Sequence, residues 1–209
     1  MKLSSGIGRS TAGKVLLSAA LLGTAASIAG LGTFATFTGS TSASHAISAG
    51  TVTASLGAAG GTDNRLTVGA SGIAAGDTVQ RVVKLTNSGS LAWASAALTT
   101  SASTSSLLDT DATDGLQLKV DRCDVAWTET GTAPAYSYTC SGTQSAVVAS
   151  RPVIGSAIAL GSLDSLSVGG SDYLRVTLAL PSSADNSFQG EASTLDFDFI
   201  GTQRAASSH

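Results

Sequence analysis

Charged and aromatic side chains are both scarce in this chain of 209 residues. Charged residues make up 12% of the sequence and aromatic residues 5%, whereas a typical globular protein is about 25% charged. The formal net charge is −3 and no run of Lys or Arg occurs, so binding to nucleic acid has no electrostatic support. With few aromatic anchors, the core has to be built from Val, Leu, Ile and Ala.

Histidine and cysteine are equally rare, with two of each. His45 and His209 lie in no recognisable site, and no HExxH pattern, nucleophile elbow or P-loop occurs. We therefore expect no catalytic residue, no cofactor and no enzymatic activity. The spacing of Cys123 and Cys140 suits a hairpin, and in an exported protein it predicts a disulfide. The alternative is two free buried thiols, since zinc would need two further ligands that have no candidates.

One acidic stretch resembles a calcium loop. Asp109, Asp111 and Asp114 lie in the sequence DTDATDG. An EF-hand needs oxygen ligands at positions one, three and five and a Glu at position twelve, but here the third acid is at position six and position twelve is Val120. The sequence favours a solvated acidic turn and leaves a calcium site as the alternative.

The N-terminal region has the three parts of an export signal. Basic residues at positions 2, 9 and 14 precede an apolar stretch over 15–31, and small residues, Thr33 and Ala35, follow it. This pattern predicts a signal peptide over 1–35 that is cleaved after Ala35, giving a secreted chain with no membrane segment. A membrane anchor is the alternative, but the stretch is short for a spanning helix, which needs ~20 residues.

The mature chain is predicted to begin with an extended arm over 36–46. Thr36, Phe37 and Thr38 open it and Ala46 ends it; Phe37 is its one large side chain. It contains no Pro, so every residue can pair in a β-ladder. Such an arm can add to an open sheet edge. A disordered tail is the alternative.

Residues 47–203 read as a series of short alternating strands separated by turns. The first alternation covers 51–56 and the clearest covers 173–180. This pattern predicts an all-β domain, a jelly-roll-like antiparallel β-sandwich, followed by a polar tail over 204–209. We also expect a strand at 65–70 and a loop at 101–106.

A parity change marks the segment around the first cysteine. Apolar positions are even-numbered up to Val120 and odd-numbered from Cys123, and a β-bulge at 121–122 would keep both sets on one face. A hairpin would then pair three sets of residues. These pairs are Cys123–Cys140, Val125–Tyr138 and Trp127–Tyr136.

Three motifs, which occur along the chain in the same order as in one known family, resemble that family. They are NSFQGEASTLDFDFIGTQ at 186–203, GDTVQRVVKLTNSGSLA at 76–92, and GTFATFT at 32–38 followed by SAGTVTASL at 48–56. Together they resemble the closing strand, a central strand and the leader end of the TasA/camelysin family of exported matrix proteins. The hairpin with Cys123 and Cys140 departs from the family pattern.

The resemblance implies a jelly-roll fold, export through a dedicated signal peptidase of the SipW type, and assembly into biofilm matrix or surface fibres. Fibres of the family are joined by donor-strand exchange, in which one subunit's arm completes the next subunit's sheet. The expected partners are therefore copies of this chain and the signal peptidase. A camelysin-like metallopeptidase and a monomeric surface-binding module are the alternatives.

Overall fold

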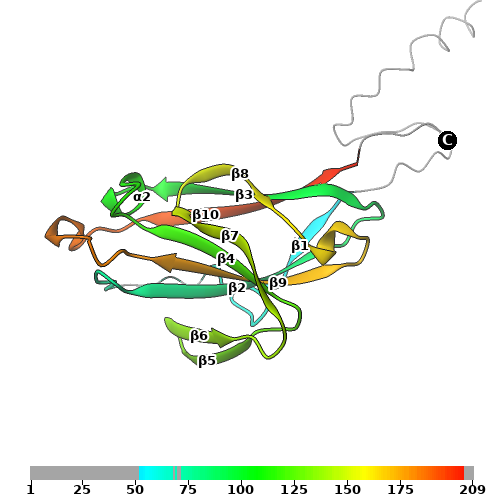
Figure 1. The fold of residues 1–209 in the computed structure, drawn as a ribbon, viewed down its shortest axis with the longest axis horizontal. Coiled ribbons are helices and arrows are strands. Elements are labelled where there is room, and N and C mark those ends of the chain that lie inside the picture. The colour runs from blue at the N-terminus through cyan, green and yellow to red at the C-terminus, as the bar shows by residue number, and fades with distance from the viewer. Residues whose placement is uncertain (1–51, 68, 70–71, 205–209) are drawn as a thin grey trace, which may run out of the picture. The chain divides into compact units, whose positions relative to one another are not determined.

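The computed structural model describes residues 52–67, 69 and 72–204, which form two antiparallel sheets that face each other (Figure 1). The five-stranded sheet has the order β1-β2-β9-β4-β7 and the three-stranded sheet the order β10-β3-β8, while β5 and β6 form a separate hairpin. The strands are β1 (Ala54–Leu56), β2 (Thr78–Asn87), β3 (Trp93–Thr104), β4 (Gln117–Cys123), β5 (Thr128–Thr132), β6 (Ala135–Thr139), β7 (Gln144–Pro152), β8 (Gly155–Leu160), β9 (Ser171–Ala179) and β10 (Thr194–Gln203). Three short helical turns join them: α2 (Leu107–Thr110), η1 (Asp164–Leu166) and η2 (Asn186–Phe188).

A single aliphatic core lies between the two sheets, as the composition predicts. Alternation along each strand turns every second side chain inward, and the inward positions are almost all Val, Leu or Ile. The core also includes Trp93, which packs against Gly201 on the neighbouring strand; a Cβ at Gly201 would lie 2.5 Å from the indole ring. The most deeply buried members are Val83, Leu85, Leu98, Leu118, Val120, Val153, Leu174 and Val176.

The predicted fold class is confirmed, since the described residues form an antiparallel all-β sandwich. The alternation over 173–180 corresponds to β9, and the motifs at 76–92 and 186–203 contain β2 and β10. The first alternation is shorter than expected, because β1 covers Ala54–Leu56 alone. It pairs with the far end of β2, from Ala54↔Asn87 to Leu56↔Leu85.

Two local expectations are wrong. Residues 65–67 form no strand, and 66–67 form a turn. The preceding Asn64 makes one isolated bridge to Val83, and the Arg65 side chain forms an ion pair with Glu129. The predicted loop at 101–106 is instead the end of β3 as far as Thr104. Low complexity favours a loop, but β10 supplies a pairing partner from far along the chain, with Leu195 opposite Ala102.

The bulge and the hairpin register are also wrong. Strand β4 pairs with β9 without a register shift. Its pairing with β7 does shift between Val120 and Asp121, but the extra residue, Val147, lies in β7. Cys123 therefore lies on the opposite face from Val120. That outer face is buried as well, because the hairpin covers it: Cys123 is 0% exposed. Hairpin pairing starts at Thr128↔Thr139, since Asp124 leaves the sheet to form two hydrogen bonds with Thr143.

The predicted signal peptide (1–35), the arm (36–46) and both histidines lie outside the described residues. In the part of the chain that is described, no helix has the length and hydropathy needed to cross a membrane.

Replacing Leu98 by Ala should cost the fold about 2–5 kcal/mol of unfolding free energy, because the side chain is fully buried between the sheets. The matched control is Ile200→Ala on the neighbouring strand, where the side chain is 53% exposed and the change should stay within ~0.5 kcal/mol. Urea unfolding of both variants measures the difference. Equal losses would contradict the assignment of the core face.

Candidate functional site

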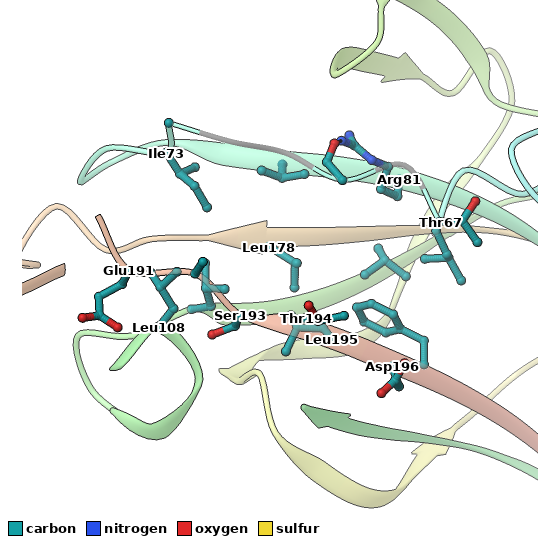
Figure 2. Close-up of a pocket in the computed structure, with 18 of the residues that line it drawn as sticks. Thr67, Ile73, Arg81, Leu108, Leu178, Glu191, Ser193, Thr194, Leu195 and Asp196 are labelled. Atoms are coloured by element: carbon teal, nitrogen blue, oxygen red, sulfur yellow. Dashed lines mark hydrogen bonds between the residues drawn. The ribbon is translucent and has the colours of Figure 1, made fainter. Parts of the chain in front are cut away.

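A large apolar cleft opens at one edge of the sandwich. Its volume is about 780 Å³, and it lies between β2 and β9 of one sheet and β10 of the other (Figure 2). We call it the edge cleft. Its apolar lining residues are Leu56, Leu66, Ile73, Val79, Leu108, Leu116, Val176, Leu178, Phe188, Leu195 and Phe197.

The cleft exists because the strand beside it is short. Strand β1 has three residues and β2 has ten, so β1 covers only the Leu85–Asn87 end of β2. The inward side chains of β10, including Leu195 and Phe197, are consequently only partly buried, whereas Leu98 on the next strand is fully buried. Figure 2 shows Leu178 and Leu195 reaching the same space from opposite sheets.

Strand β10 also has an unpaired edge. It is ten residues long and is the terminal strand of its sheet, and within the described residues it pairs only with β3. The N–H and C=O groups along its other edge are therefore available to an added strand. Asp196 and Asp198 on β10 are both exposed, and Asp196 is also one of the residues that line the edge cleft.

The three aspartates of the candidate calcium loop each serve a separate local structure. Asp109 accepts hydrogen bonds from Ser105, Ser193 and the Ser106 N–H; burial opposes its ionisation, but these hydrogen bonds outweigh it and lower the pKa of Asp109. Asp111 accepts from the N–H groups of Thr113 and Asp114. The Asp114 carboxylate accepts from the Ser183 hydroxyl. The structure does not bring the three carboxylates together as a ligand set.

A catalytic zinc site does not fit the described residues. Such a site needs about three protein ligands, usually His with Glu or Asp, and the described ranges contain no histidine. Within those ranges, the one group of three potential ligands within 4.8 Å of one another is Cys123, Asp124 and Cys140. Its two sulfurs are bonded to each other, and only a thiolate is a metal ligand.

The disulfide between Cys123 and Cys140 is present, as their spacing predicts, with a Cα–Cα distance of 5.8 Å. It ties the hairpin Thr128–Thr139 to the end of β4. Between the disulfide and the hairpin, the indole N–H of Trp127 donates to the Tyr173 carbonyl. The Trp127 ring also stacks on the Arg175 guanidinium at 4.3 Å. The hairpin is therefore fixed to the outer face of the five-stranded sheet.

An ion pair connects this hairpin to the turn that lines the edge cleft. Arg65 donates to both carboxylate oxygens of Glu129, at 2.7 and 2.9 Å, and the Tyr138 hydroxyl donates to Glu129 at 2.9 Å. The hydrogen bond from Arg65 lowers the pKa of Glu129. The pair therefore contributes its full stability at pH values above the ordinary pKa of a glutamate. This contribution is lost as the pH falls through the lowered pKa of Glu129.

The edge cleft and the Arg65–Glu129 pair were not predicted from the sequence. Leu66, Val79 and Leu195 occur in segments of alternating sequence, but this spacing does not reveal which edge of a sandwich is left uncovered. One signal was visible: Arg81 interrupts the apolar face of β2, and it lines the cleft. Glu129 carries no signal, since it stands alone in a Thr-rich turn.

Comparison with protein families identifies a match over nearly the whole chain. A family model described as camelysin metallo-endopeptidase matches residues 10–208, which include both sheets and the hairpin. A search of curated proteins found no match.

Replacing both cysteines by Ser should lower the unfolding free energy by roughly 3 kcal/mol, the chain-entropy value for a closed loop of about this size. The separation of the two cysteines is 17 residues. Urea unfolding measures the loss. Alkylation of the parent protein without reductant, followed by intact-mass measurement, should leave both cysteines unlabelled, and two labels would contradict the bond.

Proposed function

This chain belongs to the camelysin metallo-endopeptidase family, and within that family we propose that it is a secreted structural subunit of an extracellular or biofilm matrix fibre. The observation that carries the proposal is the edge cleft, which combines an apolar floor with the unpaired edge of β10. A strand added along β10 gains backbone hydrogen bonds and can insert alternate side chains into the cleft. The site is suited to binding an extended chain.

The predicted arm over 36–46 suits this edge. Its eleven positions span ~36 Å when extended, and a ten-residue strand such as β10 spans ~33 Å. Each backbone hydrogen bond adds about 1 kcal/mol net. Phe37, the one large side chain of the arm, contributes up to ~3 kcal/mol if it is fully buried in the cleft.

Residues 47–51 join the arm to the described domain. When the arm enters the cleft of a second copy, each subunit both donates and accepts. Such a head-to-tail interface does not close on itself and produces a filament.

The resemblance to the TasA/camelysin family supports the same assignment. Donor-strand exchange is the family's mode of assembly, and the motifs at 32–38 and 48–56 resemble the segments that carry the arm. We propose that a dedicated signal peptidase releases the chain after Ala35, so that Thr36 becomes the first residue of the arm. The chain is then secreted and becomes part of the matrix or the cell surface.

Deleting residues 36–46 should give a folded monomer that forms no fibres, because the cleft then has no strand to accept. Phe37→Asp should weaken assembly by up to roughly 100-fold, the equivalent of ~3 kcal/mol. Thr38→Asp is the matched control, since neighbouring residues of a strand point to opposite faces. Electron microscopy and elongation kinetics report the outcome.

The melting temperature of the folded domain should be nearly unchanged in Phe37→Asp. Fibres from the deletion variant would refute strand donation by this arm. A monomeric parent protein would instead favour a surface-binding module.

The family description favours peptidase activity as a second candidate function. The donor set of the described residues does not fit a catalytic zinc, so homogeneous protein should not cleave casein. The assay compares protein treated with a chelator and then reloaded with Zn²⁺ against untreated protein. Chelator-sensitive cleavage that zinc restores would establish peptidase activity. It would also contradict the conclusion that the described residues do not fit a catalytic zinc.

A further inference from the structure

The hairpin Thr128–Thr139 lies against the outer face of the five-stranded sheet, yet two of its contacts reach the edge cleft. It is anchored covalently, because Cys140 follows β6 and is bonded to Cys123 at the end of β4. Strand β4 is a central strand, paired with β9 on one side and β7 on the other. The anchor is therefore one of the most fixed parts of the sandwich.

The first contact holds the turn that forms one wall of the cleft. Arg65 binds Glu129 through two hydrogen bonds, and its guanidinium lies 4.8 Å from the centre of the Tyr136 ring. The residues on either side of Arg65, Asn64 and Leu66, both line the cleft. Arg65 and Glu129 are 17% and 19% exposed, so the pair is only partly screened by solvent.

This wall has little regular pairing of its own. Asn64 forms an isolated bridge to Val83, and the Arg65 N–H donates to the Val82 carbonyl at 2.8 Å. Two further hydrogen bonds act here: the Lys84 N–H donates to the Asp63 carbonyl at 2.7 Å, and the Leu66 N–H donates to Asn64 Oδ1 at 3.2 Å. The position of Leu66 in the cleft therefore depends on these few backbone contacts and on the ion pair to the hairpin.

The second contact starts from the floor of the cleft. Arg81 lines the cleft and is 5% exposed. Its guanidinium donates to the Pro134 carbonyl at the tip of the hairpin, at 3.0 Å, and lies 5.6 Å from the centre of the Tyr136 ring. Arg81 and Arg65 thus both lie close to the Tyr136 ring.

We propose that the disulfide-closed hairpin is a brace that fixes the wall of the edge cleft, so that closure of Cys123–Cys140 makes the cleft competent to accept a strand. This inference rests on the proposed function and adds its regulation. Before export the cysteines are thiols, and the subunit does not accept strands. Oxidation by a disulfide-carrying oxidant in the exported compartment then permits assembly.

The chemistry is a two-electron exchange. The thiolate of one cysteine attacks the oxidant's disulfide, and the second cysteine displaces the mixed disulfide, which leaves Cys123–Cys140 and a reduced dithiol. In the reverse direction a dithiol such as dithiothreitol supplies two electrons and two protons. Its own sulfurs close into a ring, and the two cysteines return to thiols.

Hydrogen exchange tests the brace without relying on assembly. The secreted protein is compared with Glu129→Gln, with the double variant Cys123→Ser/Cys140→Ser, and with parent protein reduced by dithiothreitol. Amides in 60–67 should exchange about tenfold faster in all three, the scale of a local opening. Strand β9 should keep the parental rate in Glu129→Gln, and in the other two samples it should stay more protected than 60–67 although the global stability is lower. The retained protection of β9 shows that the sandwich remains folded.

Asp164→Asn is the matched control. Asp164 also forms an ion pair with an arginine, Arg122. It lies in η1, and within the described part of the chain it makes no hydrogen bond or ion pair with the hairpin. This variant should exchange in 60–67 at the parental rate. Parental exchange in Glu129→Gln and in reduced protein would overturn the brace, as would equal acceleration in the control.

Fibre elongation by the same samples tests the consequence. It should slow about tenfold in Glu129→Gln and in reduced protein, in step with the faster exchange, and remain parental in Asp164→Asn. Faster exchange with unchanged elongation would overturn the regulatory role. If the parent forms no fibres, the proposed function fails, and the exchange comparison alone decides whether the hairpin braces the wall.

Discussion

The length difference between β1 and β2 is the constraint on which the rest of the account depends. Strand β1 has three residues and pairs with only one end of the ten-residue β2, and the edge cleft opens beside β10. A sheet edge that carries unpaired backbone groups above an apolar floor is normally avoided, because it recruits other chains. Here that edge is the physical basis of the proposed assembly.

The outer face of the five-stranded sheet shows a second departure from a simple sandwich. Instead of facing water, it buries Asp121, which is 1% exposed and bonded to Arg175 and Lys119. Burial opposes the ionisation of Asp121, but the hydrogen bonds from Arg175 and Lys119 prevail and lower its pKa. The disulfide-anchored hairpin thus creates a third layer of polar and aromatic contacts, and this layer extends as far as the cleft.

The sequence predicted the strands in which one face is buried in the core and the other face is more exposed. The strand over 173–180 could be identified because one face of β9 is buried and the other is less so. The parity change after Val120 was visible but was interpreted as a bulge, since alternation does not indicate that both faces of β4 are covered. The strand end at Thr104 and the position of the cleft depend on pairing with β10, a contact distant in sequence that no local pattern specifies.

The central claim is that the edge cleft of one subunit holds the arm of another, and site-specific photocrosslinking tests it most directly. A photoreactive phenylalanine analogue at position 37, in fibres grown from mixed isotope-labelled and unlabelled subunits, reports both the contact and the chain that provides it. The account predicts crosslinks between labelled and unlabelled chains at cleft segments such as β9 and β10. Crosslinks confined to one chain, or directed to the outer faces of the sheets, would contradict it.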